Sequence, residues 1–276
     1  MKKLGIGLTA ALAMVLGLAV SASAQPTGLY FTPKVGYSHM KAGGSENGDL
    51  TYEDDGTGDN DFIAEGGASG KSGKGRAVLG LAIGYDFKPN FDVPLRAEFE
   101  YAWRGKKEFS RRWTGDINGE IDGATVNHSG DLPFATKAEF GAQSFFFNAY
   151  FDIHNDTPVT PYFGAGLGWA RVTADYSISA DFTETGLAGV EHLGTLSKSK
   201  NNFAWNIGAG AAWKITDNLA LDLGYRYADF GKAPSVTYAE SGSNIFMAGD
   251  AAELNYAFNG SRVTNHEVLL GLRVTF

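Results

Sequence analysis

The stretch that decides the fold is LLGLRVTF, which runs from Leu269 to Phe276. Its apolar residues alternate with small or polar ones, the apolar set being Leu270, Leu272, Val274 and Phe276. A period of two is typical of a strand with one apolar face. In an open sheet such a strand would be an exposed edge that invites aggregation. The stretch therefore predicts a closed barrel, in which this strand pairs with the first one near Leu29 to Ser38.

The first residues have the features of an export signal. Two lysines precede an apolar run from Leu4 to Val20, and the small residues Ala22-Ser23-Ala24 follow. This pattern predicts a signal peptide over residues 1–24, cleaved before Gln25, although an uncleaved anchor is the alternative. No other stretch approaches the roughly 18 apolar residues of a spanning helix, so any membrane residence would have to use strands.

Composition narrows the class of protein further. The sequence has 276 residues, a net charge of −8, 37 glycines and no cysteine. The absence of cysteine excludes a disulfide framework and thiolate metal sites. The acidic balance argues against a nucleic-acid partner. No linker divides residues 25–276, so we expect one all-β domain.

Alternation predicts eight strands, each close to the roughly 9–11 residues that a tilted membrane strand requires. They are Leu29–Ser38, Ala77–Phe87, Val93–Arg104, Gln143–Ile153, Tyr162–Val172, Phe203–Ile215, Leu219–Phe230 and Asn265–Phe276. Long connections alternate with short ones, the long ones being His39–Arg76, Gly105–Ala142, Thr173–Asn202 and Gly231–Thr264. This spacing predicts a monomeric, eight-stranded antiparallel transmembrane β-barrel with four long extracellular loops and short periplasmic turns.

The predicted strands have one apolar face and one face of glycine, amide and charge. Charged residues of the polar face form a candidate ion-pair network in the lumen: Lys34, Arg96, Glu98, Glu100, Arg104, Asp152, Asp222, Arg226, Glu267 and Arg273. A lipocalin-like secreted barrel would turn the apolar face inward. Three features favour the membrane barrel instead: glycine-rich runs that suit a crowded lumen, balanced charges, and aromatic residues collected at both strand ends.

Two stretches resemble a known family. NAYFDIHNDTPVTPYFGAGLGWA (Asn148 to Ala170) and LALDLGYRYADF (Leu219 to Phe230) are similar to the opacity-like and surface-antigen families of small outer-membrane barrels, which are related to the OmpA membrane domain. The resemblance implies an eight-stranded barrel without the peptidoglycan-binding domain of OmpA. It also implies that the terminal residues serve as the signal for the outer-membrane assembly machinery, namely Gly271, Leu272, Val274 and Phe276.

Catalysis is an alternative that depends on histidine. The five histidines are His39, His128, His154, His192 and His266. Only His39, beside Ser38, and His266, beside Glu267, are expected at the outer rim, where a histidine, a serine and a carboxylate could meet. Small barrels bring polar rim residues together in any case, so we expect no enzyme.

Cofactor signals are weak. The acidic stretch EDDGTGDND (Glu53 to Asp61) lacks the spacing of an EF-hand, so a solvated acidic loop is favoured over a Ca²⁺ or Mg²⁺ site. GAGLG, at Gly164 to Gly168, does not complete a dinucleotide fingerprint. We expect no metal and no cofactor.

The sequence thus predicts a structural and adhesive protein of the outer membrane of a Gram-negative bacterium. The expected partners are outer-membrane lipid and lipopolysaccharide, the assembly machinery, and host or matrix ligands that contact the loops. A small porin is the first alternative and a barrel enzyme the second.

Overall fold

The computed structural model describes residues 27–53, 62–121, 124–181, 190–242 and 251–276. The expected signal peptide lies outside the described residues, as do His128's side chain, His192's side chain and most of the acidic stretch that follows Glu53. Within the described residues, no helix has the length and apolar content needed to cross a bilayer.

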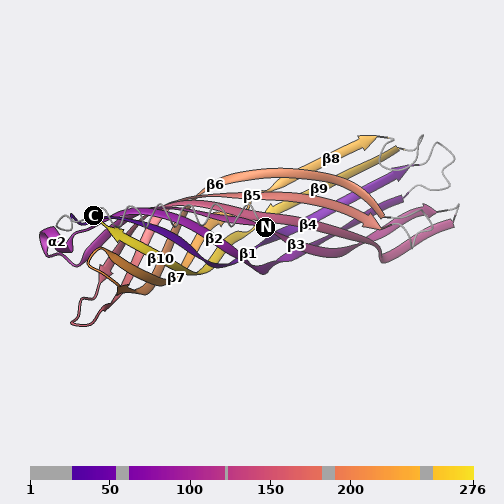
Figure 1. Cartoon of the computed structure of the whole chain (residues 1–276). Helices are drawn as coiled ribbons and strands as arrows, with labels where there is room; N and C mark the ends of the chain where they lie inside the picture. Colours follow the sequence, from indigo (N-terminus) through magenta and orange to yellow (C-terminus); the bar gives the residue numbers. More distant parts are fainter. Residues whose placement is uncertain (1–26, 54–61, 122–123, 182–189, 243–250) are drawn as a thin grey trace, which may run out of the picture.

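Ten strands and one short helix make up the described chain (Figure 1). They are β1 (Leu29–Glu53), β2 (Phe62–Asp86), α2 (Lys88–Phe91), β3 (Leu95–Ile121), β4 (Ala124–Asp152), β5 (Val159–Asp181), β6 (Val190–Lys214), β7 (Leu219–Lys232), β8 (Val236–Gly242), β9 (Ala251–Gly260) and β10 (Arg262–Thr275). The short turns, α2 and the C-terminus lie at one end of the molecule.

The sheet closes on itself. The hydrogen-bonded order is β10-β7-β6-β5-β4-β3-β2-β1, and β10 pairs again with β1 from Tyr30 opposite Thr275 to Lys41 opposite Thr264. The Phe276 amide donates to the Leu29 carbonyl at 2.9 Å, so pairing continues to the last residue. The predicted closed barrel of eight antiparallel strands is confirmed, with β8 and β9 as an outward continuation of its last hairpin.

The strands are longer than expected. Strands β1 to β6 contain 23 to 29 residues, which is more than twice the roughly 9–11 needed to cross a membrane. The predicted boundaries were therefore wrong at the outer ends. Much of the four segments expected as long loops continues the barrel as paired strand, and we call the described residues within 40–75, 106–141, 172–203 and 231–264 the head.

The two faces of β1, β4 and β5 exchange polarity where the head begins. In β1, Lys34 faces the lumen and Tyr37 is exposed on the outside, whereas Met40 and Ala42 are fully buried and Lys41 is exposed. The alternation of side chains does not change, so the same row of residues that is polar in the lower barrel becomes apolar in the head. This exchange is what two solvents require: apolar residues face lipid below and the protein interior above.

In β3 a register irregularity assists the exchange. Between Arg104 and Lys107 the pairing with β4 shifts, and after it the odd-numbered residues turn inward. Trp103 is exposed on the outside, while Phe109 and Trp113 are buried. A β-bulge inserts one residue and so re-aims every side chain beyond it.

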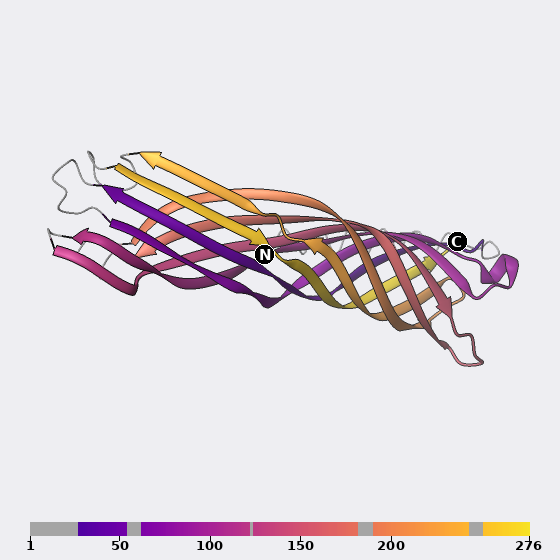
Figure 2. The ribbon, with the colours of Figure 1, turned by 180° about the vertical axis from the view of Figure 1, so that it is seen from behind.

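Above the barrel the sheet divides into two. The pairing of β2 with β3 lapses between Gly66 and Val78, and β8 pairs only with β9. Two facing four-stranded sheets result, β8-β9-β1-β2 and β3-β4-β5-β6. They lie at the end of the molecule opposite α2 and the C-terminus (Figure 2). They remain joined near the tip, where residues 62–66 of β2 pair with β3 again.

An aromatic core lies between these two sheets. Phe258 of β9 packs against Tyr176 of β5, with ring centroids 4.8 Å apart, and against Phe140 of β4 at 6.4 Å. The Tyr176 hydroxyl donates to the Pro234 carbonyl at 2.9 Å, and all four residues are buried. The head is thus a packed structure of its own, continuous with the barrel beneath it.

Replacing Phe140 with alanine tests this core. A large-to-small change at a buried phenylalanine costs about 3–5 kcal/mol, so the F140A head should open and become sensitive to protease. Phe147 lies on the same strand but is 48% exposed toward lipid, so F147A is the matched control and should remain resistant. Limited proteolysis of the folded protein in detergent, followed by mass spectrometry, makes the comparison, and equal resistance of the two variants would contradict a packed head.

Candidate functional site

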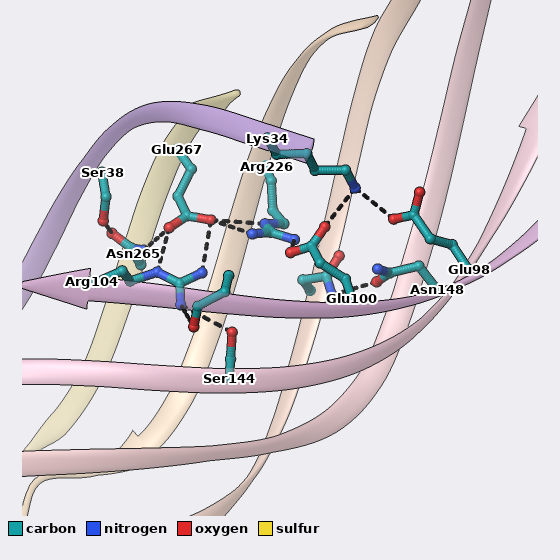
Figure 3. Close-up of polar contacts among 12 residues, drawn as sticks. Lys34, Ser38, Glu98, Glu100, Arg104, Ser144, Asn148, Arg226, Asn265 and Glu267 are labelled. Carbon is teal, nitrogen blue, oxygen red and sulfur yellow. Dashed lines mark hydrogen bonds and ion pairs between the residues drawn. The ribbon is translucent and has the colours of Figure 1, made fainter. Parts of the chain in front are cut away.

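A continuous chain of ion pairs crosses the lumen of the barrel (Figure 3). Lys34 of β1 lies between two carboxylates of β3, with its Nζ 2.5 Å from Glu98 Oε1 and 2.6 Å from Glu100 Oε2. Arg226 of β7 then joins Glu100 at 2.6 Å to Glu267 of β10 at 2.5 Å. The chain therefore links strands from opposite sides of the barrel.

The outer end of the chain is Arg104. Its Nε lies 2.5 Å from Glu267 Oε1, and its Nη1 donates to Ser144 Oγ at 2.9 Å. Asn265 donates to the same Glu267 oxygen at 2.6 Å and accepts a bond from Ser38 Oγ at 2.8 Å. Both carboxylate oxygens of Glu267 are thus satisfied.

A second cluster fills the lumen nearer the short turns. Arg96 makes two bonds to Asp152, at 2.7 and 2.9 Å, and Arg273 lies 3.5 Å from Asp222. Three tyrosine rings surround the Arg96 guanidinium, with centroids 4.9 to 6.0 Å from its Cζ: Tyr30, Tyr150 and Tyr162. These cation–π contacts fill space that ion pairs alone would leave open.

All ten charged residues expected in the lumen are found in these ion pairs, five cations with five anions. An eight-stranded barrel is just wide enough for side chains to fill. Removing one member of a buried ion pair costs about 3–5 kcal/mol, because its partner is left charged and unpaired. The arrangement can therefore hold the barrel closed and fix the register of the five strands that carry these residues, β1, β3, β4, β7 and β10.

The sequence reasoning missed the three tyrosines of the lumen, and it missed the head core entirely. A signal for the tyrosines was present, because Tyr30, Tyr150 and Tyr162 each precede a phenylalanine that falls on the apolar face of its predicted strand, namely Phe31, Phe151 and Phe163. Strict alternation places the preceding residue in the lumen.

The rim residues considered for catalysis face opposite ways. His39 and His266 are opposite each other on β1 and β10, on the outer surface of the barrel. Ser38 and Glu267 face the lumen, where both are buried. The His266 ring nitrogen Nδ1 is 2.7 Å from the Tyr225 hydroxyl instead. The structure therefore does not bring a histidine, a serine and a carboxylate together here, and His154 lies in a short turn at the opposite end.

Among residues whose side chains the structure describes, no three histidine or acidic side chains lie close enough together to hold a metal ion.

Aromatic side chains mark two levels on the outside of the barrel. Near the short turns lie Tyr85, Phe151, Phe163 and Trp213, and near the head lie Tyr37, Trp103, Phe145, Trp169, Trp205 and Tyr227. Some are in contact across strands, as Phe145 is with Trp169 at 5.4 Å. Two levels of aromatic side chains around a barrel are typical of the two interfaces between lipid and water.

Cations lie immediately beyond the upper aromatic level, at the base of the head. Six exposed residues from β1, β3, β5, β7 and β10 form what we call the basic belt: Lys41, Lys106, Lys107, Arg171, Lys232 and Arg262. Lys106 pairs with Asp175, and although partial burial acts to raise the pKa of this carboxyl, bonds from Lys106 and Ser197 hold it below its usual value. The belt is a positive surface on an acidic protein.

A closed barrel with an apolar outer band, two aromatic levels and a charged, filled lumen defines a transmembrane protein of the outer-membrane β-barrel class. Comparison with known families agrees. The chain matches the outer membrane protein beta-barrel domain over residues 8–276 and belongs to that family. The resemblance inferred from sequence is thereby confirmed, and the protein is an outer-membrane surface protein.

The chain is similar to several other proteins. The chain is 32% identical over 265 residues to outer membrane protein PagN of Salmonella typhimurium, covering 95% of both chains. It is 24% identical to a Rickettsia conorii protein provisionally named an adhesin, over 51% of this chain and 50% of that protein. Among solved structures, Neisserial surface protein A is 17% identical with a TM-score of 0.41, covering 92% of this chain and 100% of that one.

The filled lumen should not conduct ions steadily. In planar bilayers we expect the purified protein to show no large, lasting conductance, because side chains occupy the lumen. Arg226→Ala removes the cation that joins Glu100 to Glu267, so this variant should show more frequent brief openings. A stable conductance of porin size in the unchanged protein would contradict the filled lumen.

The role of Phe276 as part of an assembly signal stays a prediction. Phe276 and Leu272 are partly exposed on β10 and its end, while Val274 is buried and Gly271 faces the lumen. A charge at the interface costs about 0–1 kcal/mol against about 2–4 kcal/mol at the midplane, so folding alone predicts a mild effect for Phe276→Asp.

Recognition during assembly predicts the opposite order of severity in cells for Phe276→Asp and the deeper variant Leu270→Asp. In cells, F276D should be lost from the outer membrane, yet it should refold almost normally into detergent, whereas L270D should refold poorly. Membrane fractionation and the heat-dependent gel shift measure the two quantities. Normal membrane levels of F276D would show that Phe276 is ordinary interfacial packing.

Proposed function

We propose that this protein is a monomeric surface adhesin, in which a closed barrel anchors a structured head that contacts host cells, matrix or neighbouring cells. The observation that carries the proposal is the packed core between the two sheets of the head. A transmembrane barrel requires no such extension to be stable. A head that projects from the membrane on paired strands presents a fixed surface, which lowers the entropic cost of binding a partner.

The basic belt has a separate role in this proposal. It lies next to the upper aromatic residues, at the level of lipid headgroups, where cations are attracted to anionic groups. We infer that Lys41, Lys106, Lys107, Arg171, Lys232 and Arg262 contact phosphates of lipopolysaccharide. The belt would thereby hold the head upright at the surface.

The proposal also includes export through cleavage before Gln25 and a non-catalytic role. The relative named an adhesin supports the class of function but covers only half of this chain. The opposed directions of His39 and Glu267 support a function without catalysis at the rim.

Removing the head tests the proposed function. The strand register allows each hairpin to be shortened at paired residues: Lys41 with Gly73, Lys107 with Phe140, Thr173 with Ser199, and Lys232 with Arg262. We expect bacteria that produce the headless barrel to lose adherence to cultured cells or matrix, while the heat-dependent gel shift of the barrel remains. Adherence equal to that of the full protein, at equal surface amounts, would overturn the proposal.

A further inference from the structure

Within the described residues, one stretch of β6 in the head pairs with a strand on one side only. From Leu196 to Asn201, β6 pairs with β5, and its pairing with β7 begins at Trp205 opposite Asp229. Strand β8 follows β7 in the sequence, but within the described residues it pairs with β9 and not with β6. We call this free side of β6 the open edge. Its backbone amides and carbonyls are available for a further strand.

The gap between β2 and β3 in the head differs from the open edge, because side chains bridge it. Where β2 and β3 separate, arginine side chains bridge the gap: Arg76 donates to the carbonyl of Gly105 at 2.9 Å, and Arg111 donates to that of Gly70 at 2.8 Å. At the open edge the side-chain bridge between the described parts of β6 and the β7–β8 segment is at its base, where Asn202 donates to the Lys232 carbonyl at 2.8 Å.

Two lysines on β6 give the open edge its charge. Lys198 is opposite Ala174 and Lys200 is opposite Val172, and both partners are fully buried in the head core. Directly opposed residues share a face of the sheet, so the two lysines lie on the core-facing side of β6. They are nevertheless exposed, because no strand lies beyond them.

Neither lysine has a carboxylate partner among the side chains that the structure describes. Among the ion pairs of the described residues, none involves Lys198, Lys200 or the neighbouring Lys232 at the base of the edge. Inward-facing charges on an edge prevent pairing with an identical edge, because like charges would then meet. The same charges favour a strand that carries acidic residues.

We propose that the open edge binds an extended acidic peptide by strand addition. The peptide would pair its backbone with β6 between Leu196 and Asn201, and carboxylates at alternate positions would meet Lys198 and Lys200. Residues two apart on a strand lie roughly 6.6–6.8 Å from each other on one face, so the matching pattern is Glu or Asp at every second residue. Main-chain bonds provide affinity in this mode and side chains provide selectivity. The proposal rests on the proposed function, since it names the class of partner for the head.

The test uses the full protein in detergent and a fluorescent octapeptide of alternating threonine and glutamate. We expect saturable binding by anisotropy, together with slower amide hydrogen exchange in residues 196–201. The K198Q/K200Q double variant should weaken binding at least tenfold. The control K71Q/K137Q removes the same charge from exposed positions elsewhere on the head, outside the basic belt, and should change binding less than twofold.

Two further peptides separate strand addition from simple charge attraction. A peptide of the same sequence with every amide nitrogen methylated, and one with lysine in place of glutamate, should both fail to bind. Equal binding of the methylated peptide, or no change in hydrogen exchange of β6, would overturn the proposal. So would dimerisation that K198Q/K200Q abolishes without any peptide binding, since it would assign the edge to a second copy.

The outcome is independent of the adhesion experiment. If the octapeptide does not bind but the headless barrel loses adherence, strand addition is wrong and the proposed function stands. If the headless barrel adheres normally, the proposed function is wrong whatever the peptide does.

Discussion

The strands of the barrel pass from one solvent into another, and the rest of the structure follows from that constraint. In lipid, every backbone polar group must be paired within the protein, so the sheet closes from β10 to β1. In water, the same strands must bury apolar side chains, so the inward row changes from Lys34 to Met40 within a few residues of β1. In β1 the alternation of the backbone satisfies both solvents because only the identity of the side chains changes, whereas in β3 a bulge after Arg104 also reverses the inward row.

The change of solvent also explains why the two halves are held together differently. The lower lumen is filled by charges that compensate one another, with Glu267 joined to both Arg104 and Arg226. The head is filled by aromatic rings, with Phe258 against Tyr176. Full closure is compulsory only in lipid, since water can satisfy a free edge. The head can therefore open between β2 and β3 and along β6, which is where it can bind partners.

The barrel was predictable from sequence because alternation, aromatic positions and connection lengths all pointed to one structure. The ion pairs followed from the same pattern, since charges such as Glu100 and Arg226 fell on one face. The head was not predicted, because residues 39–76 and 105–142 lack an apolar face continuous with the membrane strands. Their apolar face is the opposite one, and the bulge after Arg104 shifts its phase again. Which edge stays free depends on pairing between distant strands, which no local pattern reports.

The most direct test of the exchange of polarity is a spin-label scan along β4. The sequence has no cysteine, so single cysteines can be introduced one at a time from Lys137 to Phe151 and labelled in the bilayer. Labels at Phe145 and Phe147 should be reached by oxygen, labels at Lys137 and Glu139 by a water-soluble nickel complex, and labels at Ala138 and Ala142, which are buried alanines of the same strand, by neither. Oxygen-dominated access at Lys137 and Glu139, or nickel access at both Ala138 and Ala142, would contradict an apolar core outside the membrane.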